Sequence, residues 1–404
     1  MEKIQRLSNN KILLILLAFT LFLGTTLIPA MRIYIMLPLI LWLFYYLYAV
    51  RKNLDKWEKY IVAVSLFVIL SCMISHRYNY QPFSLTLFFS YPYLGLLSYF
   101  FMKWASPNAE NTFKVLKRIF YIVVGCYILQ VLLYPLVLFG SALGDINTVS
   151  GSFRMRFVCS LIFFLFFLYG LNQYYLGKGL RNLHYCILGG LPIIIMGFRS
   201  LTVLTVLSAF LMLFFTKKNL WHFIKYAVGI FVIALIAIRI PLVQYKMDEM
   251  MKRQESEQTF QNEDYVRLIS LAYYDSYFSE RPLVRIFGGG YPLVTYDGPH
   301  NRSNKYQAYV SNGVDSGLMW NDLGLIGLSY IIGIPAVVLL LILCIRCIVQ
   351  CKDPSLQYIR FALLISILGS IMTSQELYRD GNFLLIGVLL YYLKVHNEEK
   401  ILSK

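Results

Sequence analysis

Long apolar segments dominate this sequence, and they limit what it can fold into. Most are close to the length of about 20 residues that a helix needs to cross the hydrocarbon core of a bilayer. In lipid an unpaired backbone amide costs several kcal/mol, so such segments cross as helices, whose amides are paired internally. The sequence therefore predicts an all-α polytopic membrane protein with about 12 transmembrane helices.

The composition agrees with this prediction, since only 14% of the 404 residues are charged, against about 25% in soluble domains. The first apolar segment is long enough to remain as a membrane helix, so we do not expect a cleaved signal peptide. The predicted spans cover residues 12–30, 33–50, 60–75, 83–102, 119–139, 157–175, 183–198, 201–216, 220–240, 317–345, 359–377 and 383–393.

The basic residues predict how these spans are oriented. The formal net charge is +16, but Lys and Arg occur in short clusters between apolar segments, which is typical of orientation signals and not of a nucleic-acid-binding domain. If the N-terminus is cytoplasmic, the inner connections hold most of these residues. We therefore predict a multi-pass membrane protein with both termini in the cytoplasm.

One long polar segment interrupts the spans late in the chain. It divides the sequence into transmembrane helices 1–9 (residues 1–240), a long extracytoplasmic loop with short helices (241–316), and transmembrane helices 10–12 with a cytoplasmic tail (317–404). Within the loop, EDYVRLISLAYYDSYFSE predicts an amphipathic helix that ends before Pro282, with Tyr265, Ile269, Ala272 and Tyr273 on one face. Functional residues concentrate on loops held by a rigid scaffold, so we look for the site here.

Arginines at the predicted outer ends of spans are the first candidate site residues. Arg154, Arg156 and Arg199 lie there, and Arg267 lies on the predicted loop helix. A planar guanidinium can contact a phosphate through two hydrogen bonds. One interpretation is a pocket for a diphosphate at the outer leaflet, and the alternative is that each arginine only extends toward the interface.

His300 and Asp315 are the candidates for acid–base chemistry. His300 is the one histidine in the long loop, and an ordinary pKa near 6.5 suits a general base. Asp315 could orient a base or bind a sugar hydroxyl, or it could cap the helix predicted to begin near Gly317.

Glycines and tyrosines in the loop each allow two interpretations. Gly288, Gly289 and Gly290 could present backbone amides to an anion, or they could form a tight turn. The chain's 32 tyrosines could stack on sugar rings, or belong to the aromatic belt of a membrane protein.

Nucleotide and metal motifs are missing from the sequence, so we predict no cofactor and no metal. Cys344, Cys347 and Cys351 have a spacing that resembles a metal site, but no histidine is near them. Chains of acidic residues within spans, as expected in a proton-driven pump, are missing too.

Four stretches resemble the bacterial O-antigen polymerase (Wzy-type) and O-antigen ligase superfamily of membrane glycosyltransferases. They lie in the second two-thirds of the chain, around the long loop. In order they are VSGSFRMRFV (149–158), MGFRSLTVLTVL (196–207), DYVRLISLAYYDSYFSERPLVRIFGGGYP (264–292) and PHNRSNKYQAYVSNGVDSGLMWNDLGLIGL (299–328).

The resemblance implies a bacterial inner (cytoplasmic) membrane protein with a GT-C-like arrangement. It also implies a metal-independent transfer from an undecaprenyl-diphosphate-linked donor. Arg154 or Arg156, together with Arg199 and Arg267, would bind the diphosphate. His300, or else Asp315, would accept a proton from the acceptor hydroxyl.

The implied function is polymerisation of surface polysaccharide repeat units, of lipopolysaccharide O-antigen or capsule. The partners would be lipid-linked donor and acceptor oligosaccharides, the bilayer, a chain-length regulator and a flippase, without nucleic acid. The alternatives are the ligase of the same superfamily and a flippase or transporter of lipid-linked oligosaccharides; a transporter predicts pseudo-symmetric halves, which the sequence does not display.

Overall fold

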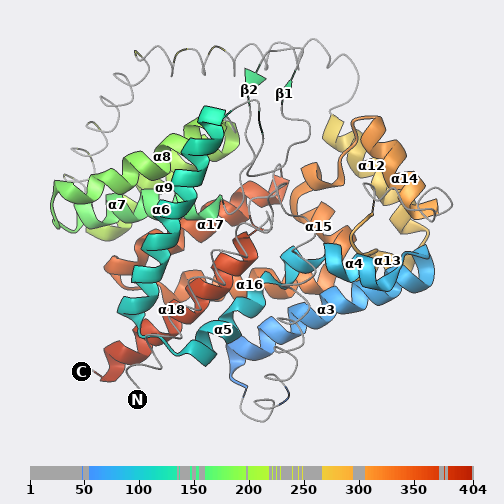
Figure 1. Cartoon of the computed structure of the whole chain (residues 1–404), viewed down its shortest axis with the longest axis horizontal. Coiled ribbons are helices and arrows are strands. Elements are labelled where there is room, and N and C mark those ends of the chain that lie inside the picture. Colours follow the sequence, from blue (N-terminus) through green and yellow to red (C-terminus); the bar gives the residue numbers. More distant parts are fainter. Residues whose placement is uncertain are drawn as a thin grey trace.

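The computed structural model describes residues 54–133, 160–196, 199–217, 266–293, 305–372 and 381–402, with a few positions between these ranges. The regular secondary structure of these residues is helical apart from one pair of two-residue strands (Figure 1). The α-helices are α3 (Lys56–Asn79), α4 (Phe83–Phe89), α5 (Ser98–Ala105), α6 (Ala109–Leu133), α7 (Leu161–Tyr175), α8 (Leu183–Met196), α9 (Arg199–Lys217), α12 (Val266–Ser279), α13 (Pro282–Phe287), α14 (Lys305–Asp315), α15 (Gly324–Ile332), α16 (Ile334–Gln350), α17 (Gln357–Met372) and α18 (Asn382–Leu402).

Short elements join these helices. The 3₁₀ turns are η2 (Tyr91–Leu97), η3 (Leu180–Asn182), η4 (Trp320–Leu323) and η5 (Pro354–Leu356). Strands β1 (Ile146–Asn147) and β2 (Ser152–Phe153) pair antiparallel, with Ile146 opposite Phe153.

Several helices are long and apolar enough to cross a membrane. Among the described residues three helices meet this condition, and up to five segments do if each of two bent helix pairs counts as one span. The three are Lys56–Asn79, Ala109–Leu133 and Pro354–Ile371, while Leu161–Tyr175, Leu180–Met196 and Leu201–Thr216 are apolar but shorter. Three of the twelve predicted spans (12–30, 33–50 and 220–240) lie outside the described residues, apart from isolated positions.

Two predicted spans are not single helices. The segment 83–102 is bent by 62° between Phe83–Phe89 and Tyr91–Ala105, and the segment 317–345 is bent by 119° between Trp320–Ile332 and Ile334–Gln350. The second break falls at Gly333, whose φ of +90° favours glycine, and Pro335 then occupies the first turn of α16. These two predicted spans are therefore broken helices, and Pro92 and Pro335 each lie just after the break.

Backbone contact with the glycine run fixes the break at Gly333. A Cβ atom added to Gly333 would lie 2.6 Å from the carbonyl carbon of Phe287, and one added to Gly288 would lie 2.4 Å from the carbonyl oxygen of Ile331. Real Cβ atoms do not approach so closely, so the two chain breaks pass each other only because both carry glycine.

Helix α18 lies against several neighbours near the middle of the molecule (Figure 1). Its backbone carbonyl at Leu384 accepts a 2.7 Å hydrogen bond from Ser98, and its Tyr391 hydroxyl donates to the carbonyl of Pro107 at 3.0 Å. Helices α6 to α9 lie to one side of α17 and α18, and α12 to α14 lie to the other with the end of α3 (Figure 1).

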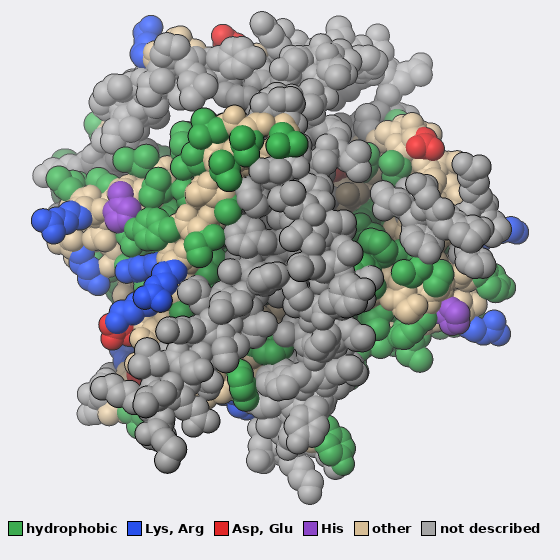
Figure 2. All heavy atoms as spheres, viewed as in Figure 1, with side chains coloured by type: hydrophobic (Ala, Val, Ile, Leu, Met, Phe, Trp, Pro, Cys, Tyr) green, Lys and Arg blue, Asp and Glu red, His purple; other side chains and the backbone are tan. Residues whose placement is uncertain are grey.

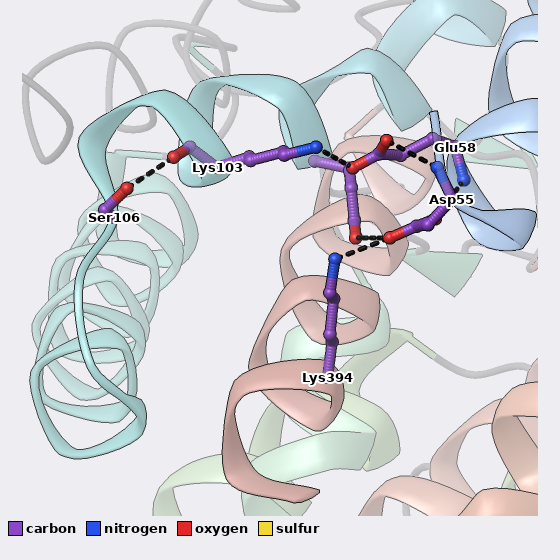
Figure 3. A network of polar contacts seen from close by, with 6 residues as sticks. Asp55, Glu58, Lys103, Ser106 and Lys394 are labelled. Carbon is purple, nitrogen blue, oxygen red and sulfur yellow. Dashed lines mark hydrogen bonds and ion pairs between the residues drawn. The ribbon is translucent and has the colours of Figure 1, made fainter. Parts of the chain in front are cut away.

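A network of four charged side chains joins the start of α3 to α5 and α18 (Figure 3). Asp55 and Glu58 form a capping box at the start of α3. Lys394 contacts Asp55 and Lys103 contacts Glu58, each at 2.5 Å, and Glu58 is fully buried. Burial opposes the ionisation of Asp55, but hydrogen bonds from Lys394 and from the Glu58 amide outweigh it and lower the pKa of Asp55.

Candidate functional site

Helices α12, α13 and α14 form a unit that we call the tyrosine-rich unit. Tyr273 of α12 stacks on Tyr309 of α14 with ring centroids 4.2 Å apart, and Tyr277 lies 5.4 Å from Tyr306. Phe278 stacks on a ring of α15 at 4.4 Å. Stacked and edge-on rings at these distances stabilise beyond their buried area. The rings therefore hold α12, α14 and α15 together.

The face of α12 that is buried differs from the predicted face. The buried residues of α12 are Ser270, Tyr274, Tyr277 and Phe278, whereas Ile269 and Ala272 are exposed. Aromatic residues on more than one side of this helix make its apolar face ambiguous in the sequence, and packing on α14 and α15 selects the outcome. The predicted end of the helix before Pro282 is confirmed.

The tyrosine hydroxyls in this unit bond to protein groups. Tyr274 donates to the carbonyl of Leu318 at 2.9 Å, Tyr277 to the Oδ1 atom of Asn79 at 3.1 Å, and Tyr306 to the carbonyl of Gly290 at 3.3 Å. Burial raises the pKa of Tyr277 and Tyr306, so both remain protonated donors. These three tyrosines are part of a packed core, and sugar stacking is not what holds them there.

Buried amide side chains join the tyrosine-rich unit to the end of α3. The Nε2 atom of Gln81 donates to Ser75 at 2.6 Å and lies 3.4 Å from the carbonyl of Gly289. Its Oε1 atom accepts from the amide of Leu293 at 3.2 Å and from Gln307 of α14 at 3.3 Å. Gln81 thus contacts α3, the glycine run and α14 at once.

The glycine run does not form an anion site. The amide of Gly288 donates to Val284 at 2.8 Å, that of Gly289 to Tyr330 at 2.7 Å, and that of Gly290 to Ile331 at 3.1 Å. All three N–H groups are therefore bonded to backbone carbonyls. The alternative of an anion-binding nest is therefore wrong. Gly288 ends α13, and Gly289 and Gly290 pair with the end of α15.

Arg267 and Asp315 lie at the same end of the tyrosine-rich unit. Tyr273 of α12 contacts Tyr309 of α14, and Tyr277, one turn later in α12, contacts Tyr306, one turn earlier in α14, so the two helices run antiparallel. Gly313 packs against Tyr273, which continues this register toward the start of α12. Arg267 is the second residue of α12 and half-buried, and Asp315 is the last residue of α14 and exposed.

The alternative that Asp315 caps the following helix is wrong. Asp315 ends α14, and Met319 occupies the N-cap position of η4. A carboxylate at this place is available to a hydroxyl or to a cation.

The remaining predicted site residues are described incompletely or not at all. Arg199 is the first residue of α9, where only its backbone is described. His300, Arg154 and Arg156 lie outside the described residues. Within the described ranges, no group of three or more His, Cys, Asp or Glu residues could hold a metal ion, and Cys344, Cys347 and Cys351 are buried on or beside α16.

Two arginines of the unit were missed by the sequence analysis. The guanidinium of Arg281 lies 3.9 Å from the ring centroid of Tyr277 and donates to the Tyr277 carbonyl at 2.8 Å. Arg285 pairs with Asp275 at 3.2 Å. The i,i+4 spacing of Tyr277 and Arg281, just before Pro282, was the available signal. Both arginines fasten α12 to α13.

Chemically, the end of the unit offers a guanidinium and a carboxylate on a rigid support. A guanidinium binds phosphate oxygens, and a carboxylate accepts hydrogen bonds from hydroxyl groups.

The fold is that of a helical protein with several helices able to cross a membrane. No family model matches the chain, and no curated protein sequence matches it.

Proposed function

We propose that this protein polymerises surface polysaccharide repeat units, transferring a growing glycan from a polyprenyl diphosphate to a sugar hydroxyl of another lipid-linked unit. The observation that supports this most is the placement of Arg267 and Asp315 at the same end of the tyrosine-rich unit, which is built on the end of α3. A lipid-linked substrate needs its phosphates and its sugars held together at the membrane surface, and this pair supplies both kinds of contact.

In this proposal the arginines bind and stabilise the diphosphate that leaves. Arg267 and Arg199, with Arg154 and Arg156, would face the negative charge that develops on the leaving group. Fixed positive charge placed where such charge appears is a large contribution to catalysis. The unit would lie outside the cytoplasm of a bacterial inner membrane, with both chain termini inside.

The acceptor hydroxyl attacks the anomeric carbon while the carbon–oxygen bond to the diphosphate breaks. His300 would accept the hydroxyl proton, with Asp315 as the alternative base. Donor and acceptor are both lipid-linked, so the reaction forms a longer lipid-linked glycan and a free polyprenyl diphosphate.

The direct test is glycan synthesis by the purified protein in vesicles supplied with a lipid-linked repeat unit. We expect a ladder of elongated products from the wild type and none from Arg267→Ala. Arg267→Lys should restore little activity, because an ammonium lacks the planar fork. The matched control is Arg77→Ala, which removes an exposed arginine in the last turn of α3 and should leave the ladder intact.

Two outcomes would contradict the proposal. Normal ladders from folded Arg267→Ala would remove this residue from the site. Transfer of a finished glycan to a different acceptor, without elongation by repeat units, would identify a ligase.

A further inference from the structure

Basic side chains gather where the start of α6 meets η3 and the start of α8. We call Lys117, Lys178, Arg181 and His184 the α6–α8 basic cluster. Lys178, Arg181 and His184 are exposed and Lys117 is half-buried. Among the described residues no carboxylate pairs with Lys117, Lys178 or Arg181, and the charged neighbours of Lys117 are Lys114 and Lys178. This concentration of positive charge calls for an anion.

The position of Lys117 is fixed by aromatic rings. Its ammonium lies 5.0 Å from the ring centroid of Phe113, 5.5 Å from that of Tyr169 and 5.9 Å from that of Tyr185. Contacts with several ring faces orient a cation at low entropic cost. Lys117 is therefore a placed cation, unlike a surface lysine that is free to turn away.

His184 is placed in the same way. Its Nε2 atom lies 2.8 Å from the Tyr121 hydroxyl, and its Nδ1 atom contacts the carbonyl of Arg181. A carbonyl only accepts, so Nδ1 carries the proton and donates. The cluster is thus built on fixed side chains of both α6 and α8.

An apolar groove follows the basic cluster along the same two helices. Its volume is about 120 Å³, and its walls include Ile128 and Leu132 of α6 and Leu191 and Pro192 of α8. Tyr127 reaches the carbonyl of Pro192 at 3.4 Å, as Tyr121 reaches His184 further back, so α6 and α8 run in the same direction. In Figure 2, blue and purple side chains adjoin a green surface over α6 and α8.

The distance along α6 matches one leaflet of a bilayer. Lys117 and Leu132 are fifteen positions apart in the sequence, which is about 22 Å at 1.5 Å per residue. Half of a bilayer with its headgroups is about 20–22 Å thick. A phosphate at Lys117 would therefore place an acyl chain alongside the groove.

We propose that this surface binds one anionic phospholipid, with its phosphate in the α6–α8 basic cluster and one acyl chain in the groove between α6 and α8. Charge complementarity and the continuity of the groove with the cluster select this ligand. The site is separate from the tyrosine-rich unit and does not depend on the proposed glycan chemistry.

The test measures lipids retained by the full chain. The purified protein is placed in nanodiscs of phosphatidylcholine with increasing phosphatidylglycerol, and bound lipid is counted by native mass spectrometry. We expect the wild type to retain one phosphatidylglycerol in preference to phosphatidylcholine. Two lost cationic contacts should weaken this binding about 30-fold in Lys117→Gln/Arg181→Gln.

Three further variants make the test specific. Lys178→Gln removes an exposed cation and should weaken binding about fivefold without affecting folding. Ile128→Trp, which fills the groove and leaves the charges, should also weaken retention. Arg346→Gln removes an exposed positive charge stacked on Tyr60, away from the cluster, and should have no effect.

Four results would overturn the proposal. The first is that the folded double variant or Lys178→Gln retains phosphatidylglycerol as the wild type does. The second is that Arg346→Gln loses as much lipid as the cluster variants, which would indicate unspecific attraction. The third is unchanged retention by Ile128→Trp, which would remove the groove. The fourth is displacement of the lipid by inorganic phosphate alone at millimolar concentration, which would identify a free anion as the ligand.

Discussion

Replacing Lys103 by alanine should destabilise the protein far more than replacing an ordinary surface lysine. Lys103 contacts Glu58 at 2.5 Å, and the Glu58 side chain is fully buried (Figure 3). Removing one partner of a buried pair costs about 3–5 kcal/mol, because the other charge stays buried and unpaired. Glu58 would keep its hydrogen bond from the Asp55 amide. We therefore expect a loss of about 2–3 kcal/mol.

The assay is thermal unfolding in detergent, followed by intrinsic tryptophan fluorescence. For a chain of 404 residues, a loss of 2–3 kcal/mol should lower Tm by about 2.5–3.5 °C. The control is Lys114→Ala, which removes an exposed pair with Glu110 at 2.7 Å and should leave Tm nearly unchanged, because water screens an exposed pair. Glu58→Gln/Lys103→Met removes both charges and should recover at least half of the loss.

Two results would refute this reasoning about the charged network. One is a Tm for Lys103→Ala within about 1 °C of that for Lys114→Ala, below the smallest shift expected from a broken buried pair. The other is a double variant no more stable than Lys103→Ala. Either result would mean that Glu58 is not an uncompensated charge once Lys103 is gone.

Three other predictions follow from the described contacts. Gly288→Ala should lower the free energy of unfolding by about 3–5 kcal/mol, because strain at positive φ adds to a clash with the Ile331 carbonyl. In Gly317→Ala the added methyl group meets no atom within 4 Å, so only the strain remains and the loss should be about 1 kcal/mol. Thermal unfolding of both variants measures the difference. Burial would raise the pKa of Asp353, but hydrogen bonds from Lys400 and Ser355 outweigh it and lower this pKa to about 2. These bonds should therefore stabilise the folded protein fully above pH about 4, and the stabilisation should decline as pH falls toward 2. Lys400→Ala should remove most of this pH dependence of Tm. Tyr309→Phe should destabilise the protein by about 1 kcal/mol, because it removes the hydroxyl bonded to Tyr273 and keeps the stacked ring. Tyr309→Ala also removes the ring and should cost about 3–4 kcal/mol, which limited proteolysis of the α12–α14 region would detect. Equal effects of the two variants would contradict the packing argument.

The length and hydropathy of single helices were the most predictable part of the fold. The predicted span 60–75 lies within α3, and the predicted loop helix ends before Pro282 as expected. The hydropathy of a segment depends only on its own residues, so a long apolar run or a proline can be recognised in the sequence. The break at Gly333 was not predictable in the same way, because the residues on both sides of it are apolar. Its cause is the Phe287 backbone, which is distant in sequence.

The candidate site was predictable only in part for a related reason. The sequence indicates that Arg267 lies on a loop helix, but the register that brings it to the same end as Asp315 depends on ring pairs between α12 and α14. Asn79 and Gln81, which fix that unit on α3, occur as two ordinary polar residues at the end of a span. Only their buried bonds to Gly289 and Gln307 reveal their role.

The way the tyrosine-rich unit is mounted has a consequence for any reaction at Arg267. The unit contacts α3 through Gln81 and α15 through the amides of Gly289 and Gly290, so two separate helices hold it. A displacement of about 1 Å at a catalytic group is enough to slow a reaction by roughly two orders of magnitude. Gln81→Ala removes the acceptor of the buried Leu293 amide and the contact with Gln307, and should loosen the mounting without touching Arg267. A folded Gln81→Ala variant should therefore lose glycan synthesis while retaining affinity for the lipid-linked substrate. Full activity in that variant would mean that the unit does not position Arg267 for the reaction.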